Sequence, residues 1–316
     1  MAAVKYSVVV PVYRNEDSIV RLVETLSEIN QSLAGSLEVV FVVDGSPDRS
    51  YELLRGALKA MAFSAQLLAH SRNFGSFAAI RTGLAAAGGD YFAVLAADLQ
   101  EPPELLLAFF RSLEADECDV AIGTRKSRDD PLSTRLASTV FWDLYRRLVV
   151  PDMPSGGVDI FGCNRVFRDH LLQLNEARSS LIALIFWLGF RRKLIGYARV
   201  RRNDGASSWT LRKKLDYMMD SVFAFTDYPI RLLIRFGMAG VFLSIVLATT
   251  ILVARLTDVI AVPGYAATML VVLMFGGLNL LGLGLVGSYA WRAYENSKQR
   301  PLAVVAVRES NGVSLR

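Results

Sequence analysis

The stretch YFAVLAADLQEPPE, residues 91–104, contains a strand, a polar loop and a helix start in immediate succession. Its first five residues form an apolar run of strand length, too short for a helical period. Pro102-Pro103-Glu104 predicts the start of a helix, because proline tolerates the first turn and an acid suits its positive end. Asp98 and Gln100 thus stand at the carboxyl end of a buried strand, where open α/β sheets bind their ligands.

Asp98 and Gln100 are hard oxygen donors separated by a single residue. Oxygen donors of this kind suit Mg²⁺ or Mn²⁺ that carries a diphosphate, so a metal site is expected here. Spacing alone leaves a second interpretation open, in which Asp98 only caps the following helix.

Apolar strand patterns and helical patterns alternate on both sides of this stretch. Strands are expected at residues 7–12, 37–43, 66–70, 91–95 and 119–123, with helices at 16–33 and 76–87. Strands that alternate with helices of this length imply right-handed βαβ units and a mostly parallel sheet. The predicted fold class is therefore α/β, with a Rossmann-like sheet over about residues 1–165.

A dinucleotide-binding dehydrogenase is the first alternative for such a sheet. Its Gly-x-Gly-x-x-Gly should follow the first strand, but PVYRNE stands there, at residues 11–16. The same spacing does occur at Gly282, Gly284 and Gly287, inside an uncharged apolar segment. Small residues that allow close helix packing explain those glycines better.

The chain is 53% hydrophobic, and the apolar excess is concentrated between Phe236 and Ala290. Uncharged stretches at 236–254 and 263–290 are each long enough to cross a bilayer core as a helix. A buried core hairpin is the alternative for this pair. Cations flank the outer ends, so the positive-inside rule places the N-terminal domain and the tail, 291–316, in the cytoplasm. These cations are Arg231, Arg235, Arg292, Lys298 and Arg300.

A basic segment, residues 191–214, precedes the apolar pair. Its arginines and lysines favour an anionic lipid surface or phosphate groups, and the adjoining spans argue against nucleic acid. From Leu211, apolar residues recur at three- and four-residue steps, so residues 211–235 are expected to form an amphipathic juxtamembrane region. Docking of this helix on the globular domain, residues 1–210, is the alternative.

Several sequence blocks now coincide in one order. PVYRNE follows the first strand at 11–16, DGS follows the second at 44–46, DLQEPPE occupies 98–104, and two apolar spans follow. This combination resembles the family 2 glycosyltransferases of GT-A fold, specifically the polyprenyl-phosphate glycosyltransferases. Further blocks that resemble the family are SRNFG at 71–75, GTR at 123–125, GGVD at 156–159, GASSW at 205–209 and YENSKQRPL at 294–302.

The resemblance implies an enzyme that moves one sugar, with inversion, from a nucleotide-diphosphate sugar to a polyprenyl phosphate of the undecaprenyl or dolichyl type. Transfer is expected at the cytoplasmic face of a bacterial inner membrane, in cell-envelope or lipopolysaccharide glycan modification. The processive synthases carry a Gln-x-x-Arg-Trp block that this sequence lacks, which favours single-sugar transfer. The alternatives are another sugar on the same lipid and a catalytically weak membrane-bound scaffold. The sugar, the nucleotide base and the oligomeric state, a homo-oligomer included, stay open.

The resemblance also assigns roles to residues. It implies nucleotide-sugar contacts at Pro11, Tyr13, Glu16, Asp44 and Asp98, and a divalent ion, Mg²⁺ or Mn²⁺, held by Asp98 and Gln100. The lipid phosphate is expected at Arg125, Arg135, Ser138 and Arg202, because arginine forks bind phosphate oxygens bidentately. Asp159 is expected to act with Asp98 in catalysis, as a base or an orienting carboxylate; a turn-forming aspartate is the alternative.

Two positions depart from the family pattern. Many relatives carry Asp-x-Asp-x-Gln, whereas this chain has Ala96 at the first position. With that carboxylate missing, we expect lower metal affinity, or a larger share of the coordination from the donor diphosphate. Ser208 stands where lysine is usual, which removes one phosphate contact.

Overall fold

The computed structural model describes residues 4–125, 143, 145–146, 149–154, 158, 160–176, 179–198, 211–257 and 264–311. The predicted site residues Arg135, Ser138, Asp159 and Arg202 lie outside these ranges. The chain divides into two compact units. The first contains Met1–Lys214 together with Arg300–Arg316, and the second contains Leu215–Gln299.

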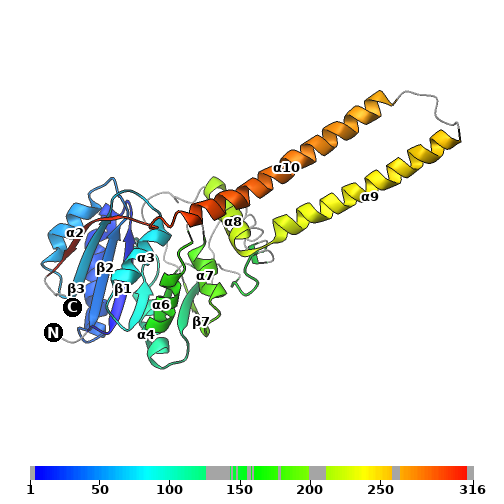
Figure 1. The fold of residues 1–316 in the computed structure, drawn as a ribbon. Coiled ribbons are helices and arrows are strands. Elements are labelled where there is room, and N and C mark those ends of the chain that lie inside the picture. The colour runs from blue at the N-terminus through cyan, green and yellow to red at the C-terminus, as the bar shows by residue number, and fades with distance from the viewer. Residues whose placement is uncertain are drawn as a thin grey trace. The chain divides into compact units, whose positions relative to one another are not determined.

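The described part of the first unit is built on one β-sheet with helices packed against it (Figure 1). The sheet has eight strands in the order β7-β5-β6-β4-β1-β2-β3-β8. The strands are β1 (Tyr6–Val12), β2 (Leu37–Val43), β3 (Ser64–His70), β4 (Tyr91–Val94), β5 (Val120–Arg125), β6 (Phe161–Asn164), β7 (Arg192–Tyr197) and β8 (Val305–Ser310). β1 pairs in parallel with β2 and β4, β2 with β3, and β5 with β7. β6 runs antiparallel between β4 and β5, and β8 runs antiparallel to β3. The predicted α/β class with a mostly parallel sheet is confirmed.

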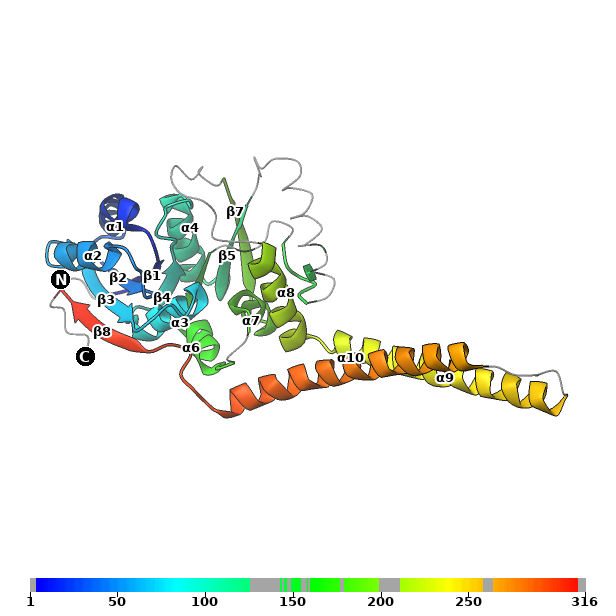
Figure 2. The same cartoon turned by 90° about the horizontal axis from the view of Figure 1, so that it is seen from above.

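Helices cover both faces of this sheet, so its central strands are buried on both sides. All seven residues of β2, LEVVFVV, are buried, which explains their nearly continuous apolar character. α3 packs with α6 on one face, and α1 packs with α4 on the other (Figure 2). The helices of this unit are α1 (Ile19–Ser32), α2 (Ser50–Leu58), α3 (Ser76–Ala86), α4 (Pro103–Glu114), α6 (Arg165–Gln173) and α7 (Leu181–Trp187), with a 3₁₀ turn, η1 (Glu16–Ser18), before α1.

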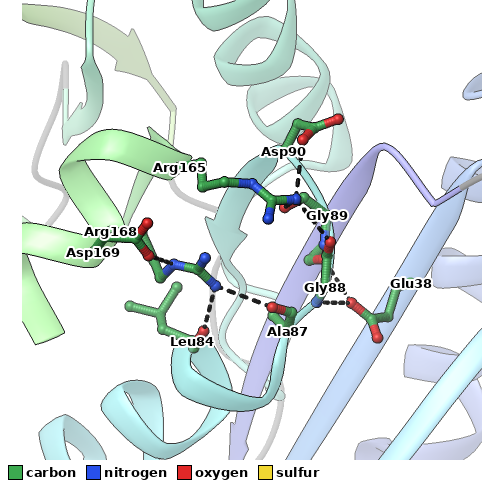
Figure 3. Close-up of polar contacts among 10 residues, drawn as sticks. Glu38, Leu84, Ala87, Gly88, Gly89, Asp90, Arg165, Arg168 and Asp169 are labelled. Atoms are coloured by element: carbon green, nitrogen blue, oxygen red, sulfur yellow. Dashed lines mark hydrogen bonds and ion pairs between the residues drawn. The ribbon is translucent and has the colours of Figure 1, made fainter. Parts of the chain in front are cut away.

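One arginine on each of α3 and α6 donates hydrogen bonds to carbonyl groups near the C-terminal end of the other helix. Arg168 of α6 donates to the carbonyls of Leu84, at 3.2 Å, and Ala87, at 3.0 Å (Figure 3). Arg81 of α3 donates to the carbonyl of Leu171 at 2.9 Å, and its other amino group reaches Leu172 at 3.2 Å. Each helix thus supplies the cation that its partner's negative end favours.

β8 comes from the segment that the sequence predicts to be a cytoplasmic tail. It pairs with β3 from Gln66↔Ser310 to His70↔Val305, with an irregularity between Ala69 and His70. Side chains add to the pairing, since Arg308 donates to Gln66 Oε1 at 2.8 Å. Residues 305–310 are therefore an edge strand of the first unit.

The second unit contains most of α8 (Leu211–Phe225), followed by α9 (Tyr228–Leu256) and α10 (Tyr265–Ser297). Within it, Arg292 donates to Asp220 at 2.7 Å, and the rings of Phe223 and Tyr289 meet edge to face at 5.2 Å. Over the residues that the structure describes, no helix combines the length and the apolarity needed to cross a membrane. The two predicted spans remain predictions.

Candidate active site

Four loops follow the parallel strands β1 to β4 at one edge of the sheet. We call them the β1 loop (residues 13–18), the β2 loop (44–49), the β3 loop (71–75) and the β4 loop (95–102). Parallel strands bring their carboxyl ends to the same edge, which is where open α/β sheets bind ligands. Hydrogen bonds fasten each of these loops to a neighbour.

Asp48 joins the β1 and β2 loops. Its carboxylate accepts hydrogen bonds from Ser46 Oγ at 2.5 Å, Ser50 Oγ at 2.9 Å and the amide of Glu16 at 3.0 Å. Burial acts to raise the pKa of Asp48, but these hydrogen bonds outweigh it and hold the pKa below its usual value. The carboxylate of Glu16 accepts in turn from the amide of Arg49 at 3.1 Å.

The β1 loop leaves an aromatic ring exposed beside a left-handed residue. Arg14 has a φ of 56°, and its amide donates to Ser46 Oγ at 2.7 Å. Tyr13 is 41% exposed, while its amide is held by Asn15 Oδ1 at 3.0 Å. A ring presented in this way can stack on a flat apolar surface such as a base.

Among the predicted site residues that the structure describes, Asp44 is the most enclosed. It is 2% exposed and accepts hydrogen bonds from His70 Nδ1 at 2.8 Å, from the amide of Phe74 at 2.8 Å and from the amide of Gly75 at 2.7 Å. Burial acts to raise its pKa, but the bonds from His70 and the two amides together keep that pKa below its usual value. Asp44 is thereby held as a carboxylate between the β2 and β3 loops.

The β4 loop contains the predicted metal ligands. Asp98 is partly exposed, whereas Gln100 is only 5% exposed. Between them, Leu99 has a φ of 51°, a left-handed conformation that is rare for leucine. Ser18 Oγ donates to the carbonyl of Ala97 at 2.8 Å and so ties the β4 loop to the end of the β1 loop.

The helix-cap interpretation of Asp98 is wrong. α4 begins at Pro103 with Pro102 as its N-cap residue, and no side chain caps this helix within the described stretch. Asp98 lies four residues before that cap, in the loop between β4 and the helix.

Asp98 and Gln100 supply oxygen donors but not a complete coordination shell. Among the described residues, no three histidine, cysteine or acidic side chains gather to hold a metal ion. Mg²⁺ is often bound by one or two carboxylates together with substrate phosphates and waters. The donor set fits an ion that takes most of its ligands from a diphosphate.

Arg125 is the last residue of β5 and is partly exposed. It pairs in register with Tyr197, the last residue of β7. β4 and β5 are both antiparallel to β6, so they share a direction and Arg125 lies at the same edge as the four loops. The structure thus brings to one edge the predicted residues Pro11, Tyr13, Glu16, Asp44, Asp98, Gln100 and Arg125.

The sequence analysis missed Ser18, Asp48 and His70. Only Asp48 left a signal, because DGSPD at 44–48 is a cluster of turn residues. The other two act through partners that are distant in sequence and give no local pattern.

Comparisons with known proteins show the family to which this chain belongs. The family model described as glycosyl transferase family 2 matches residues 7–174. A putative glycosyltransferase, CsbB, of Bacillus subtilis is 33% identical over 93% of this chain and 89% of its own length. An undecaprenyl-phosphate 4-deoxy-4-formamido-L-arabinose transferase of Edwardsiella ictaluri is 31% identical over 93% of this chain and 91% of its own. A bactoprenol glucosyl transferase of Shigella phage SfV is 27% identical over 95% and 98%.

Proposed function

Because this chain belongs to glycosyl transferase family 2 and is a glycosyltransferase, we propose that it transfers a single sugar from a nucleotide-diphosphate sugar to a polyprenyl phosphate. The main support for a polyprenyl-phosphate acceptor is the length of the similarity to proteins that are named for transfer to such lipids. That similarity spans 95% of this chain for the phage bactoprenol glucosyl transferase, well beyond the family model's residues 7–174. The confirmed α/β sheet agrees with the GT-A fold of such enzymes.

We assign the donor nucleotide to the β1 and β2 loops. Tyr13 offers an exposed ring for the base, Glu16 lies in the same loop, and Pro11 is near the end of the strand that leads into it. Asp44 is included in the donor site, although its carboxylate faces into the protein. Asp98 is partly exposed in the adjoining β4 loop, where we place the diphosphate of the donor.

Asp98 and Gln100 are the residues that we propose to hold Mg²⁺ or Mn²⁺. The ion would supply positive charge to the diphosphate that leaves the sugar. Since Ala96 offers no carboxylate, Asp98 is the one charged ligand in this motif.

The acceptor phosphate needs cations more than it needs a strong base. A phosphate monoester has its second pKa near about 6, so it is largely dianionic at neutral pH. Bringing this dianion close to a diphosphate is opposed by charge repulsion. We propose that Arg125, Arg135 and Arg202, with Ser138, offset that repulsion, and that Asp159 orients the acceptor for attack with inversion.

We further propose that residues 236–254 and 263–290 insert in a membrane, with the first unit on its cytoplasmic side. The support comes from the absence of charge in these stretches of the sequence and from exposed apolar side chains. Phe242 is 70% exposed and Leu280 is 72% exposed, which is costly for large apolar groups in water.

The proposal is tested by incubating the purified protein with short-chain polyprenyl phosphate and a panel of nucleotide sugars, followed by mass spectrometry. We expect one glycosylated lipid phosphate that depends on a divalent ion. The competing possibility is a weakly active scaffold, since the motif lacks the first aspartate. If no sugar in the panel gives either lipid glycosylation or donor hydrolysis, the result favours the scaffold.

A further inference from the structure

We infer that His70 and Asp44 form a buried positioning pair that shapes the β3 loop, residues 71–75, for binding of the donor nucleotide. The inference rests on the proposed function for the identity of the ligand. It assigns a role to His70, and it gives Asp44 the added role of holding the β3 loop.

The pair is enclosed by protein. The His70 side chain is 0% exposed and the Asp44 side chain 3%. His70 Nδ1 lies 2.8 Å from Asp44 Oδ1, and His70 Nε2 lies 3.0 Å from Thr82 Oγ1. Nδ1 carries the hydrogen that the Asp44 carboxylate accepts, and Nε2 is within hydrogen-bond distance of the Thr82 hydroxyl. Both ring nitrogens are therefore occupied inside the protein.

Asp44 also holds the β3 loop, because it accepts hydrogen bonds from two backbone amides of that loop. Its Oδ1 accepts from Phe74 at 2.8 Å and its Oδ2 from Gly75 at 2.7 Å. The ring of His70 also meets the ring of Phe74 edge to face at 5.5 Å. Three hydrogen-bond donors therefore hold the Asp44 carboxylate, and through its two amide bonds Asp44 fixes the end of the β3 loop.

The β3 loop is held at its other end and along its length. The amide of Ser71 donates to the carbonyl of Val304 at 2.9 Å. Gly45, with a φ of 58°, packs so closely that an added Cβ would lie 2.4 Å from the carbonyl carbon of Arg72. These contacts leave the Arg72 and Asn73 side chains exposed on a fixed backbone beside the β2 loop. An arginine fixed in this way suits an anionic donor.

The test compares substitutions of His70 in the full-length protein. His70→Leu removes the hydrogen bond to Asp44, so it should weaken nucleotide-sugar binding about tenfold or more, the usual effect of losing a bond to a charged group. His70→Asn places an amide NH₂ near the position of Nδ1 and should recover most of that loss. Turnover at saturating donor should change much less than the KM for the donor.

Hydrogen exchange distinguishes positioning from a general loss of stability. In His70→Leu without donor, the amides of Phe74 and Gly75 should exchange faster, while those of β2 stay protected. His170→Leu, which changes the chain's other histidine on the exposed side of α6, is the matched control and should alter neither readout. If His70→Leu does not fold, His70→Gln serves instead, because its amide reaches the position of Nε2 and not that of Nδ1.

Two results would overturn the inference. One is wild-type affinity for the nucleotide sugar in a folded His70→Leu or His70→Gln variant. The other is failure of His70→Asn to recover binding. Failure of the wild-type protein to bind any nucleotide sugar would instead count against the proposed function. The exchange rates of Phe74 and Gly75 are measured without donor, so they still decide whether His70 shapes the loop.

Discussion

Asp98 is the single carboxylate of the proposed metal motif, and its removal gives the most direct test at the scale of a residue. Asp98→Asn keeps the size of the side chain but removes its charge. We expect transfer to fall about ten- to a hundredfold or more, with the melting temperature almost unchanged, because a charged ligand contributes about 1.5–3 kcal/mol. The measurement is initial rate against metal concentration.

Asp90→Asn is a suitable control for Asp98→Asn. Asp90 precedes β4, at the opposite end of the strand from Asp98, and its ion pair with Arg165 is exposed to solvent. Its loss should leave transfer close to the wild-type rate. Full activity of Asp98→Asn in the presence of a chelator would remove Asp98 from the metal site.

Ala96 allows the opposite experiment, in which a ligand is added. Ala96→Asp recreates the Asp-x-Asp-x-Gln pattern at the end of β4, at a position that is partly exposed. A second carboxylate should lower the Mn²⁺ or Mg²⁺ concentration needed for half-maximal rate, because it adds a hard oxygen donor. An unchanged metal titration would mean that position 96 does not face the ion.

At the scale of elements, the α3–α6 pair makes a prediction about stability rather than chemistry. Arg168 is 9% exposed and donates to the carbonyls of Leu84 and Ala87 (Figure 3). Its Cζ atom lies 4.4 Å from the centre of the Phe92 ring. Arg168→Met leaves these carbonyls without their donor, so we expect a loss of about 1–3 kcal/mol in unfolding free energy. Chemical denaturation measures it.

Arg165 provides the matched control on the same helix. It donates to the carbonyls of Gly88 and Gly89, but its side chain is 49% exposed, so water can replace it (Figure 3). Arg165→Met should cost well under 1 kcal/mol, the usual range for exposed interactions. Equal losses in the two variants would mean that the burial of Arg168 has no energetic consequence.

The sequence predicted the strands β1 to β5 and missed β6, β7 and β8. Burial on both faces of a sheet gives uninterrupted apolar runs such as LEVVFVV in β2, and runs of this kind made the predicted strands recognisable. β8, with the sequence VAVRES, is largely exposed and carries no such run. Its partner strand is remote, since Arg308 bonds to Gln66, 242 residues earlier in the chain. No local pattern encodes a pairing over that separation.

The same limit applies to the site. Asp98 was placed by a strand, a loop and a proline-initiated helix within 14 residues, and the structure keeps that local order. His70 is 26 residues from Asp44, and Ser18 is 79 residues from Ala97, so their contacts depend on the packing of whole strands. Local chemistry was therefore predictable, and the bonds that join the loops were not.

At the scale of the whole molecule, β8 makes the end of the chain part of the first unit. Asn311 accepts from the amide of Ala65 at 3.1 Å and donates to the carbonyl of Phe63 at 2.7 Å. Ending the chain at Gln299 removes these bonds and the whole β3–β8 ladder. We expect a loss of at least about 2 kcal/mol, since each hydrogen bond contributes about 1 kcal/mol, and faster exchange of β3 amides.

A chain that ends at Gly312 keeps β8 and Asn311, and it controls for truncation as such. It should match the full-length protein in the exchange rates of β3. Unchanged protection of β3 in the chain that ends at Gln299 would show that the edge strand is dispensable.

The return of β8 also constrains how the chain can cross a membrane. β3 and β8 pair with each other, so the chain must leave and re-enter the same compartment between them. An even number of crossings is required, and the pair of uncharged stretches at 236–254 and 263–290 provides two. We expect a tag placed after Arg316 to be labelled from the same side as a tag on the N-terminus. A tag within Asp258–Pro263 should be labelled from the opposite side, by an impermeant reagent applied to intact cells. Labelling of all three tags from one side would mean that neither stretch crosses the membrane. Attachment would then depend on the basic segment at 191–214, whose cations can bind anionic lipid.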